Sequence, residues 1–463
     1  MSGAVDPWCV IGAGPSGLAA LKHLLALGIP ALALEREDDV GGNWYFGSGA
    51  SAVFESTRLI SSKTMTGFLD FPMPRAWPHY PDHRRCLAYL RAYADRFGLR
   101  PFIRTSTPVE RAERLPGGGW SVRTAAGTTR CAGLVVATGH NRRPRLPDLP
   151  GTFTGTLLHA CDYRSPTVPV ALAGQRVLVV GGGNSGCDIA VEASRHAART
   201  VHSTRRGYHV VPRMVMGRPS DLRGERLLRM GLPTWLRRLV ALRMIDRTIG
   251  LPWRYGLPRP DHRLWETHPV INSDLPARIR AGAIEPRGDV RAFDGAAVEF
   301  ADGSSEPFDV VILATGYRLD LPFLGTGHLA EEEGVPRLYL NMLHPQRDDV
   351  AVCGLIQPDS GQWGLTDLQG SVVARMALAA RASPRALAFL HRERTRGGDG
   401  IPRPAGIRYL ESPRHRFEVE HFSYRKRLEA LRAALDRRLR RDGALRTGSG
   451  ARRPPPGDGV RGS

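Results

Sequence analysis

The sequence predicts an α/β fold with two Rossmann-like dinucleotide-binding domains, the second inserted into the first. Two observations predict this fold. Two glycine-rich segments of the same spacing lie about one domain apart in the chain. Several apolar runs, V-L-V-V, L-V-V-A-T and V-V-I-L-A, are rich in valine and leucine and do not alternate with polar residues. Such runs are typical of parallel strands that are buried on both faces.

The first glycine segment, W-C-V-I-G-A-G-P-S-G, predicts a strand, a tight turn and a helix. Its first glycine makes the turn, the second lets backbone approach a pyrophosphate, and the third lets the helix pack on the strand. The start of the helix offers N–H groups and the positive end of its dipole to the phosphates. The residues expected to bind this dinucleotide are Gly12, Ala13, Gly14, Pro15, Ser16 and Gly17.

The second segment, R-V-L-V-V-G-G-G-N-S-G, has the same spacing at Gly181, Gly183 and Gly186. It predicts another strand, turn and helix, and therefore another dinucleotide site. A single match of this kind is weak evidence of binding. Two matches, each in the proper context, indicate an enzyme that holds two dinucleotides.

The residue after the next strand indicates which dinucleotide each unit prefers. Glu35 follows A-L-A-L, twenty-three residues after Gly12. A carboxylate there accepts hydrogen bonds from both ribose hydroxyls and repels a 2′-phosphate. In the second unit Thr204 stands twenty-three residues after Gly181, and Arg205 follows it. A guanidinium makes two charge-assisted hydrogen bonds to a phosphate, so we expect NADP in the second unit. For the first unit, with its carboxylate, we expect FAD or NAD.

Length and cysteine content bound the class of protein. The chain has 463 residues, enough for two or three domains, and six scattered cysteines without a C-x-x-C pair. This pattern argues against a structural zinc site, a disulfide framework and a dithiol redox centre. The first strand begins almost at once and no apolar run approaches membrane-spanning length, so we expect no signal peptide and a cytoplasmic location.

The net charge of +20 comes from arginine, since all but three of the 65 basic residues are arginine. In so arginine-rich a chain, a solvated surface side chain stays an alternative for Arg205. Near the C-terminus, Leu428, Leu431, Leu435 and Leu439 have the spacing of a buried helical face. Residues 441–463 are rich in glycine, proline and arginine and are expected to form a disordered basic tail. Such tails can bind nucleic acid or anionic lipid, but we favour a solvated tail and expect no nucleic-acid partner.

A third pattern, F-T-G-T-L-L-H-A-C-D-Y-R, lies between the two glycine segments. It meets every fixed position of F-x-G-x-x-x-H-x-x-x-[YF]-[KR] through Phe153, Gly155, His159, Tyr163 and Arg164. With these residues the chain resembles the flavin-containing monooxygenases, NADPH-dependent flavoproteins that oxygenate soft nucleophiles. Baeyer–Villiger monooxygenases usually carry tryptophan at the position of Tyr163. The resemblance implies that the motif supports domain geometry and the handling of NADPH.

Further matches extend the resemblance over residues 6–440 and imply additional contact residues. V-G-G-N-W is similar to a family element near the flavin, and L-T-D-L-Q is similar to a segment that borders it. N-S-G-C-D-I-A is similar to a segment that contacts NADP. The residues implied for the flavin are Asn43, Trp44 and Gln369, and those for NADP are Asn184, Ser185, Gly186, Cys187 and Asp188.

One position departs from the family. Many members have an asparagine near the flavin and the nicotinamide, in the segment aligned with S-T-R-L-I-S-S-K-T-M, and Ile60 stands there in this chain. An isoleucine cannot donate a hydrogen bond. Ser61 and Ser62 are therefore our candidates for that contact, and our hypothesis places Ser61 beside the flavin.

The resemblance implies FAD and NADPH as cofactors, with a C4a-peroxyflavin that passes oxygen from O₂ to a nucleophilic nitrogen or sulfur of a small organic substrate. Two alternatives stay open: Baeyer–Villiger oxygenation of a ketone or keto acid, and NAD(P)H oxidation without oxygenation. The missing C-x-x-C disfavours a flavin disulfide reductase. A homodimer also stays open.

The order of the motifs implies an interrupted domain. We expect an FAD domain from residues 1–165 and 305–440, with an NADP domain at 166–304 between them. An insert near residues 214–270 contains a basic amphipathic stretch with Trp235 and Trp253. We favour ordinary packing of an inserted helix, while peripheral contact with a membrane and a cover over the substrate entrance stay open.

Overall fold

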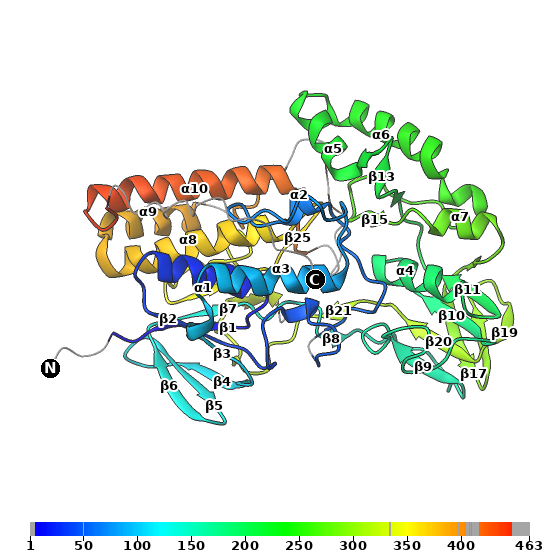
Figure 1. Ribbon diagram of the computed structural model, residues 1–463, viewed down its shortest axis with the longest axis horizontal. Coiled ribbons are helices and arrows are strands. Elements are labelled where there is room, and N and C mark those ends of the chain that lie inside the picture. Colours follow the sequence, from blue (N-terminus) through cyan, green and yellow to red (C-terminus); the bar gives the residue numbers. More distant parts are fainter. Residues whose placement is uncertain are drawn as a thin grey trace.

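The computed structural model describes residues 5–49, 51–332, 335–396, 398–403, 407, 409 and 416–446. It shows two lobes side by side, each built on a five-stranded parallel sheet (Figure 1). In both lobes helices cover one face of the parallel sheet and a three-stranded antiparallel sheet covers the other. The α/β fold class with two Rossmann-like units is therefore confirmed.

The first lobe contains a sheet in the strand order β24-β7-β1-β2-β3, with all neighbours parallel. These strands are β1 (Trp8–Ile11), β2 (Ala31–Leu34), β3 (Ile103–Arg104), β7 (Gly133–Val136) and β24 (Val350–Val352). The antiparallel sheet beside it is formed by β4 (Val109–Arg114), β5 (Trp120–Thr124) and β6 (Gly127–Cys131). Because β24 comes late in the chain, the first lobe is assembled from two distant segments.

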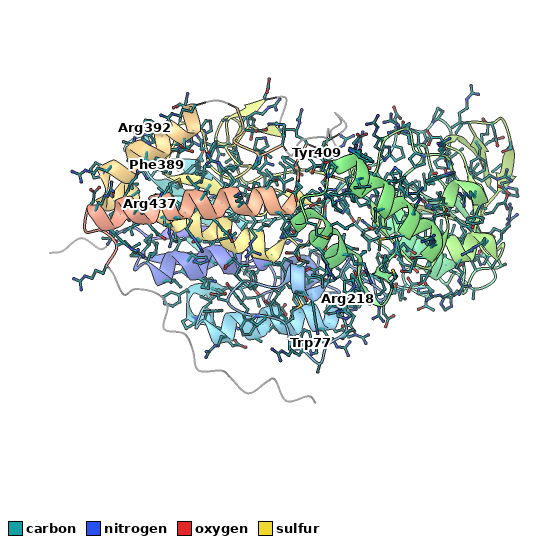
Figure 2. The ribbon with its side chains drawn as sticks, turned by 90° about the horizontal axis from the view of Figure 1, so that it is seen from above. Trp77, Arg218, Phe389, Arg392, Tyr409 and Arg437 are labelled. Carbon is teal, nitrogen blue, oxygen red and sulfur yellow. The ribbon has the colours of Figure 1, made fainter. Side chains whose placement is uncertain are left out.

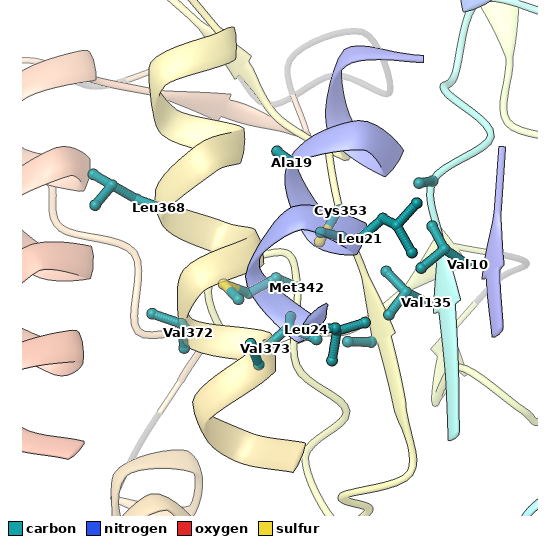
Figure 3. Close-up of a cluster of buried hydrophobic side chains, with 14 of the residues drawn as sticks. Val10, Ala19, Leu21, Leu24, Val135, Met342, Cys353, Leu368, Val372 and Val373 are labelled. Carbon is teal, nitrogen blue, oxygen red and sulfur yellow. The ribbon is translucent and has the colours of Figure 1, made fainter. Parts of the chain in front are cut away.

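Helices cover the other face of this sheet. They are α1 (Pro15–Ala26), α2 (Lys63–Thr66), α3 (His83–Arg96), α8 (Trp363–Ala382), α9 (Pro384–Thr395) and α10 (His421–Arg441). Leu21 and Leu24 of α1 pack on Val10 and Val135 of the sheet, with α8 alongside (Figure 3). Helices α1 and α8 approach closely, because a Cβ on Gly370 would lie 2.9 Å from the Cα of Ala20.

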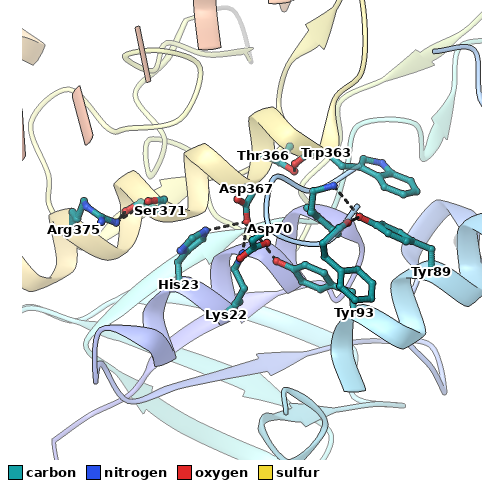
Figure 4. Close-up of polar contacts among 12 residues, drawn as sticks. Lys22, His23, Asp70, Tyr89, Tyr93, Trp363, Thr366, Asp367, Ser371 and Arg375 are labelled. Atoms are coloured by element: carbon teal, nitrogen blue, oxygen red, sulfur yellow. Dashed lines mark hydrogen bonds and ion pairs between the residues drawn. The ribbon is translucent and has the colours of Figure 1, made fainter. Parts of the chain in front are cut away.

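A buried polar cluster also joins α1 to α8 (Figure 4). The ammonium of Lys22 lies 2.6 Å from Asp367 and 2.9 Å from Asp70, and Nε2 of His23 lies 3.0 Å from Asp367. Burial opposes the charge on Asp367, but His23 and Lys22 together hold the pKa of this carboxyl well below its usual range. The cluster therefore links α1 to α8 by ion pairs within an otherwise apolar layer.

The second lobe contains a sheet in the strand order β16-β11-β10-β20-β9, again parallel throughout. Its strands are β9 (Thr156–His159), β10 (Arg176–Val180), β11 (Arg199–Ser203), β16 (Glu285–Arg287) and β20 (Val310–Leu313). Helices α4 (Asn184–Ala193) and α7 (Leu275–Arg280) belong to this lobe, as does the antiparallel sheet of β17 (Val290–Asp294), β18 (Ala297–Phe300) and β19 (Ser305–Pro307).

This strand pairing differs from the expected domain boundaries at 165/166 and 304/305. Those boundaries assign β9 and β20 to the first domain, but β20 pairs with β10 and β9 pairs with β20 in the second sheet. The chain crosses between the lobes at β8 (Arg143–Pro144) and β21 (Tyr317–Arg318), which pair with each other. We therefore propose boundaries at these paired strands.

The insert leaves the second lobe between β12 (Val210–Val211) and β15 (Val270–Ile271), which pair at its base. It contains β13 (Met214–Val215), β14 (Arg218–Pro219), α5 (Ser220–Arg229), α6 (Thr234–Ile249) and the 3₁₀ helix η3 (Pro252–Tyr255). Figure 1 shows α5 and α6, in green, beyond the parallel sheets. Trp235 on α6 is 67% exposed.

The remaining short elements connect these layers. They are η1 (Gly42–Trp44), η2 (Arg100–Phe102), β22 (Glu331–Glu332), β23 (Val335–Pro336), β25 (Gln357–Pro358) and β26 (Glu418–Val419). The helical pattern predicted near the C-terminus is confirmed, because the four leucines are buried on α10. The expected tail was placed too early, since Leu445 is buried in the core, and residues 447–463 lie outside the described residues. Among the described helices, none is both long and apolar enough to cross a bilayer.

Candidate functional site

A cavity of about 520 Å³ lies where the two lobes meet. Its wall includes the first glycine turn, the residue after β2, the start of α4 and part of the loop before α2. Segments from both lobes therefore face one shared space. This arrangement is the geometric core of the candidate site.

The first glycine turn has the form that its sequence predicts. Gly12 has φ of +101°, and a Cβ on Gly17 would lie 1.9 Å from the carbonyl oxygen of Gly12. Gly14 is the N-cap of α1 and no side chain caps the helix. The first N–H groups of α1 thus have no side-chain acceptor, which suits a phosphate group.

The second glycine turn repeats this geometry. Gly181 has φ of +129°, and a Cβ on Gly186 would lie 2.0 Å from the carbonyl oxygen of Gly181. Gly183 is the N-cap of α4, again without a side-chain cap. The structure therefore contains two turns of one type, each able to receive a phosphate at a helix start.

The two A-T-G segments explain why these turns need glycine. A Cβ on Gly12 would lie 2.7 Å from the carbonyl oxygen of Ala137, and one on Gly181 would lie 2.3 Å from that of Ala314. Each alanine follows the strand beside the strand that enters the turn. The repeated A-T-G segments therefore close the same side of both turns.

Glu35 lines the cavity directly after β2 and is 4% exposed. Its carboxylate accepts hydrogen bonds from the N–H of Ala13 at 2.6 Å and of Glu37 at 3.1 Å. Burial raises the pKa of Glu35, while these two N–H groups lower it. The carboxylate is thus anchored at the first glycine turn, where a ribose would be placed.

Arg205 is exposed after β11 and, among the residues that the structure describes, makes no hydrogen bond or ion pair. The neighbouring Arg206 pairs with Asp261 at 2.9 Å. Arg205 is therefore available to bind a phosphate, whereas Arg206 is already paired. Arg205 does not line the cavity itself, which fits a position at the far end of an extended dinucleotide.

The residues implied near the flavin separate into two groups. Asn43, Trp44 and Ser61 line the cavity, as does Ile60. The Asn43 side chain accepts a hydrogen bond from the N–H of Ala52 at 2.8 Å, which fixes the loop after Glu35. Ile60 and Ser61 therefore lie side by side in the wall of the cavity.

Two other candidates lie behind the wall instead. Ser62 is fully buried and its N–H donates to Asp221 of α5 at 2.6 Å. Gln369 is also fully buried: its amide oxygen accepts from the N–H of Gly354 at 2.9 Å and its amide nitrogen donates to Tyr424 at 2.8 Å. Since Gly354 lines the cavity, Gln369 holds the wall in place rather than facing the space.

On the second lobe, Asn184, Ser185 and Asp188 line the cavity. Asn184 accepts from the N–H of Ile271 at 2.8 Å, and Asp188 accepts from Asn272 at 2.7 Å. Asn184 and Asp188 therefore also hold α4 against β15 and the residue that follows it.

Cys187 does not face the cavity. It is fully buried, with its sulfur 3.4 Å from the hydroxyl of Tyr208. Tyr208 was missed by the sequence analysis, although its ring covers the second glycine turn. A Cβ on Gly182 would lie 2.6 Å from this ring. No local pattern marks this tyrosine, because a loop after β11 carries it onto the turn.

The residues of the F-x-G-x-x-x-H motif do not line the cavity. Tyr163 is fully buried and donates to Glu192 of α4 at 2.8 Å. The His159 ring contacts Tyr317, which lines the cavity, at 5.3 Å between centroids, and burial lowers the pKa of His159. These contacts support a role in domain geometry.

Of the other three motif residues, Phe153 and Gly155 directly precede β9, and Arg164 contacts the loop before α2. A Cβ on Gly155 would lie 2.7 Å from both the carbonyl oxygen of Asp309 and the ring of Phe153. Arg164 donates to the carbonyl of Cys161 and accepts at its own carbonyl from the N–H of Glu55 at 2.8 Å. The motif thus joins β9, α4 and the loop that precedes α2.

Two glycine turns at helix starts, a buried acid beside the first turn, and an arginine after β11 that makes no ion pair among the described residues together define a protein that binds two dinucleotides. The family model described as "Flavin-binding monooxygenase-like" matches residues 7–393. The chain belongs to this family. It is an NADPH-dependent monooxygenase with FAD as its flavin.

Curated relatives agree with this assignment, and a solved structure has the same fold. Flavin-containing monooxygenase 5 of Cavia porcellus is 33% identical over 435 residues, which cover 89% of this chain and 80% of the relative. The N-oxide-forming dimethylaniline monooxygenase 2 of Oryctolagus cuniculus is 34% identical over 391 residues, which cover 79% of this chain and 72% of the relative. A steroid monooxygenase bound to NADP shares the fold with a TM-score of 0.66 and 22% identity, covering 95% of this chain and 98% of that one.

Proposed function

We propose that this monooxygenase oxygenates a nucleophilic nitrogen or sulfur atom of a small organic substrate. The observation that carries the proposal is that residues from both lobes, beside two equivalent glycine turns, face a single cavity. A nicotinamide, a flavin and a substrate would meet in that space. Tyr163, where Baeyer–Villiger enzymes usually have tryptophan, also supports oxygenation of nitrogen or sulfur.

We further propose a division of labour among the binding residues. The first glycine turn with Glu35, Asn43 and Trp44 would hold FAD, and the second turn with Ser185 and Arg205 would hold NADPH. Bound flavin would supply electron transfer from NADPH and the activation of O₂, which is chemistry that no side chain provides. The protein's own task is to position these molecules and exclude water.

The proposal is tested by supplying the purified protein with NADPH, O₂ and three substrates: an alkylamine, a thioether and a ketone. We expect the protein to retain FAD, and NADPH consumption to match formation of an N-oxide or a sulfoxide. Formation of an ester from the ketone alone would favour the Baeyer–Villiger alternative. NADPH consumption that yields only hydrogen peroxide would favour an oxidoreductase without oxygenation and contradict the proposal.

Ser61 provides a more local test. It lines the cavity next to Ile60, so we propose that its hydroxyl donates the hydrogen bond that the family's asparagine would supply. Ser61→Ala should therefore increase hydrogen peroxide release per NADPH by roughly tenfold, the effect of losing about 1.4 kcal/mol of stabilisation. Peroxide yield and product yield are measured together, and unchanged values for both would remove Ser61 from the site.

We also propose that the protein works in the cytoplasm. None of its six cysteines forms a disulfide, which is typical of proteins in a reducing compartment. Fractionation of cells that express the full chain tests this location. Size-exclusion chromatography with light scattering tests for the homodimer left open by the sequence.

A further inference from the structure

A histidine and a carboxylate meet in the wall of the cavity, outside every motif considered above. His268 lines the cavity just before β15, and Glu418 of β26 lies behind it. Nδ1 of His268 is 3.8 Å from a carboxylate oxygen of Glu418, and the two side chains are 11% and 1% exposed. This Nδ1 is buried and has no hydrogen-bond partner among the described residues. The imidazole therefore has a carboxylate behind it and the cavity in front.

Other charged groups surround this pair. The titratable or charged side chains near it are Asp359, Glu420, His421, Tyr409 and Arg237. Figure 2 labels Tyr409 where α10 meets the green helices of the insert. Burial and the neighbouring Glu420 raise the pKa of Asp359 to about 7. With Glu418, three carboxylates lie on this side of the cavity, and the guanidinium of Arg237 is near two of them, Asp359 and Glu420. The excess of carboxylates attracts a cationic group.

The carboxylates are held in place by backbone donors. Asp359 accepts from the N–H of His421 at 2.9 Å. Glu420 caps the start of α10 and accepts from the N–H groups of Phe422 at 3.0 Å and Ser423 at 2.8 Å. This wall is thus a fixed arrangement and not a mobile surface cluster.

We propose that His268 removes the proton from a cationic alkylamine substrate, with Glu418 orienting and stabilising the resulting imidazolium. The inference rests on the proposed oxygenation of nitrogen and names the substrate class: amines that are protonated at neutral pH. In this step the N–H bond of the ammonium breaks, the proton moves to Nε2 of His268, and the electron pair stays on the substrate nitrogen. That pair is the nucleophile that oxygenation requires.

An alkylamine must lose a proton before its nitrogen can be oxygenated. An alkylamine has a pKa of about 10, so roughly one molecule in a thousand carries a free electron pair at pH 7. Burial in the cavity disfavours the charged amine, and this effect favours transfer of its proton to a neighbouring base. A thioether has no proton to lose and does not need the base.

The test compares His268→Gln with wild type on a trialkylamine and on a thioether of the same carbon skeleton. We expect the variant to lose on the order of 10²-fold in kcat/KM for the amine and to keep the thioether rate within about twofold. Below the pKa of the amine, the variant's rate with the amine should rise about tenfold per pH unit, while wild type changes less steeply. His196→Gln, at an exposed position of the second lobe, is the matched control.

A second measurement needs no turnover. Isotope-labelled histidine resonances are recorded on the oxidised holoenzyme without NADPH, and the signal absent from His268→Gln identifies His268. Adding the amine should shift this signal toward the imidazolium position, and adding the thioether should not. Glu418→Gln should weaken the shift.

The outcomes separate the inference from the proposed function. If wild type oxygenates the thioether and His268→Gln loses both substrates equally, or neither, the inference is overturned while the function stands. An absent shift on adding the amine overturns it regardless of activity. If wild type oxygenates neither substrate, the proposed function fails, and the resonance shift alone then decides whether His268 takes the proton.

Discussion

At the scale of single residues, Glu35 and Arg205, which follow corresponding strands of the two glycine units, differ in burial and in partners. Glu35 is buried against the first glycine turn, where its carboxylate is held by two backbone N–H groups. Arg205 is exposed and free of partners among the described residues, while Arg206 is already engaged by Asp261. An anchored acid selects a free ribose, and an unengaged guanidinium is available for a 2′-phosphate.

Arg205→Ala should therefore weaken the binding of NADPH and leave the binding of NADH nearly unchanged. A lost charged hydrogen bond costs about 1.5–3 kcal/mol, so we expect the KM for NADPH to rise by about tenfold or more. The KM for NADH should stay within about twofold. Steady-state kinetics with both nucleotides measure the difference, and Arg206→Ala is the control. Equal losses for both nucleotides would show that Arg205 does not recognise the phosphate.

Residue positions were predictable where the requirement is local. The glycine spacing located both turns, because a positive φ and a helix packed on the turn each demand glycine at a fixed offset. His268 and Glu418 could not be paired from sequence, since the lobe interface brings them together from distant segments. The same holds for Gln369, whose partner Gly354 decides that it lies behind the wall.

At the scale of elements, each glycine turn is a unit of strand, turn and helix that can be damaged separately. Gly17→Ala and Gly186→Ala place a methyl group against the carbonyl oxygens of Gly12 and Gly181, respectively. We expect Gly17→Ala to purify with little FAD, and Gly186→Ala to keep FAD but lose reduction by NADPH. Flavin absorbance and anaerobic reduction measure the two effects. Loss of FAD from both variants in equal measure would contradict separate sites.

The contribution of the ion pairs between α1 and α8 to stability should depend on pH. Because the folded pKa of Asp367 lies below the unfolded value of about 3.9, its contribution to stability is complete above that pH and is lost as the pH falls. Asp367→Ala should lower the free energy of unfolding by about 3 kcal/mol at pH 7, since buried Lys22 then keeps only its ion pair with the more exposed Asp70. Denaturant unfolding at pH 7 and pH 3 measures the free energy of unfolding of both proteins. The difference between wild type and Asp367→Ala should be smaller at pH 3.

Glu429→Ala is a suitable control, because its pair with Arg425 on α10 is partly exposed. It should change stability by about 0.5 kcal/mol or less. An Asp367 variant as stable as this control would show that the cluster does not hold α1 to α8.

At the scale of the whole molecule, the insert reaches back from the second lobe to the wall of the cavity. Asp221 of α5 accepts from the N–H of Ser62 at 2.6 Å, and the hydroxyl of Tyr80 donates to the carbonyl of Arg213. Burial raises the pKa of Asp221, while the N–H of Ser62 lowers it. The segment that carries Ser61 is therefore held by a residue of the other lobe.

Asp221→Ala should loosen this segment while leaving both glycine turns intact. We expect roughly tenfold more hydrogen peroxide per NADPH, because a less closed cavity admits water, while FAD content stays unchanged. Asp221→Asn keeps an acceptor oxygen and should behave much like wild type. Peroxide release equal to wild type in the alanine variant would mean that the insert does not control closure.

The interrupted first lobe has a consequence for how the protein is made. All strands of the second sheet lie between Thr156 and Leu313, whereas the first sheet lacks its β24 edge until Val350–Val352 has been synthesised. Domains form as units during translation once their segments have emerged from the ribosome. We therefore expect the second lobe to fold while the first lobe still lacks one edge of its sheet.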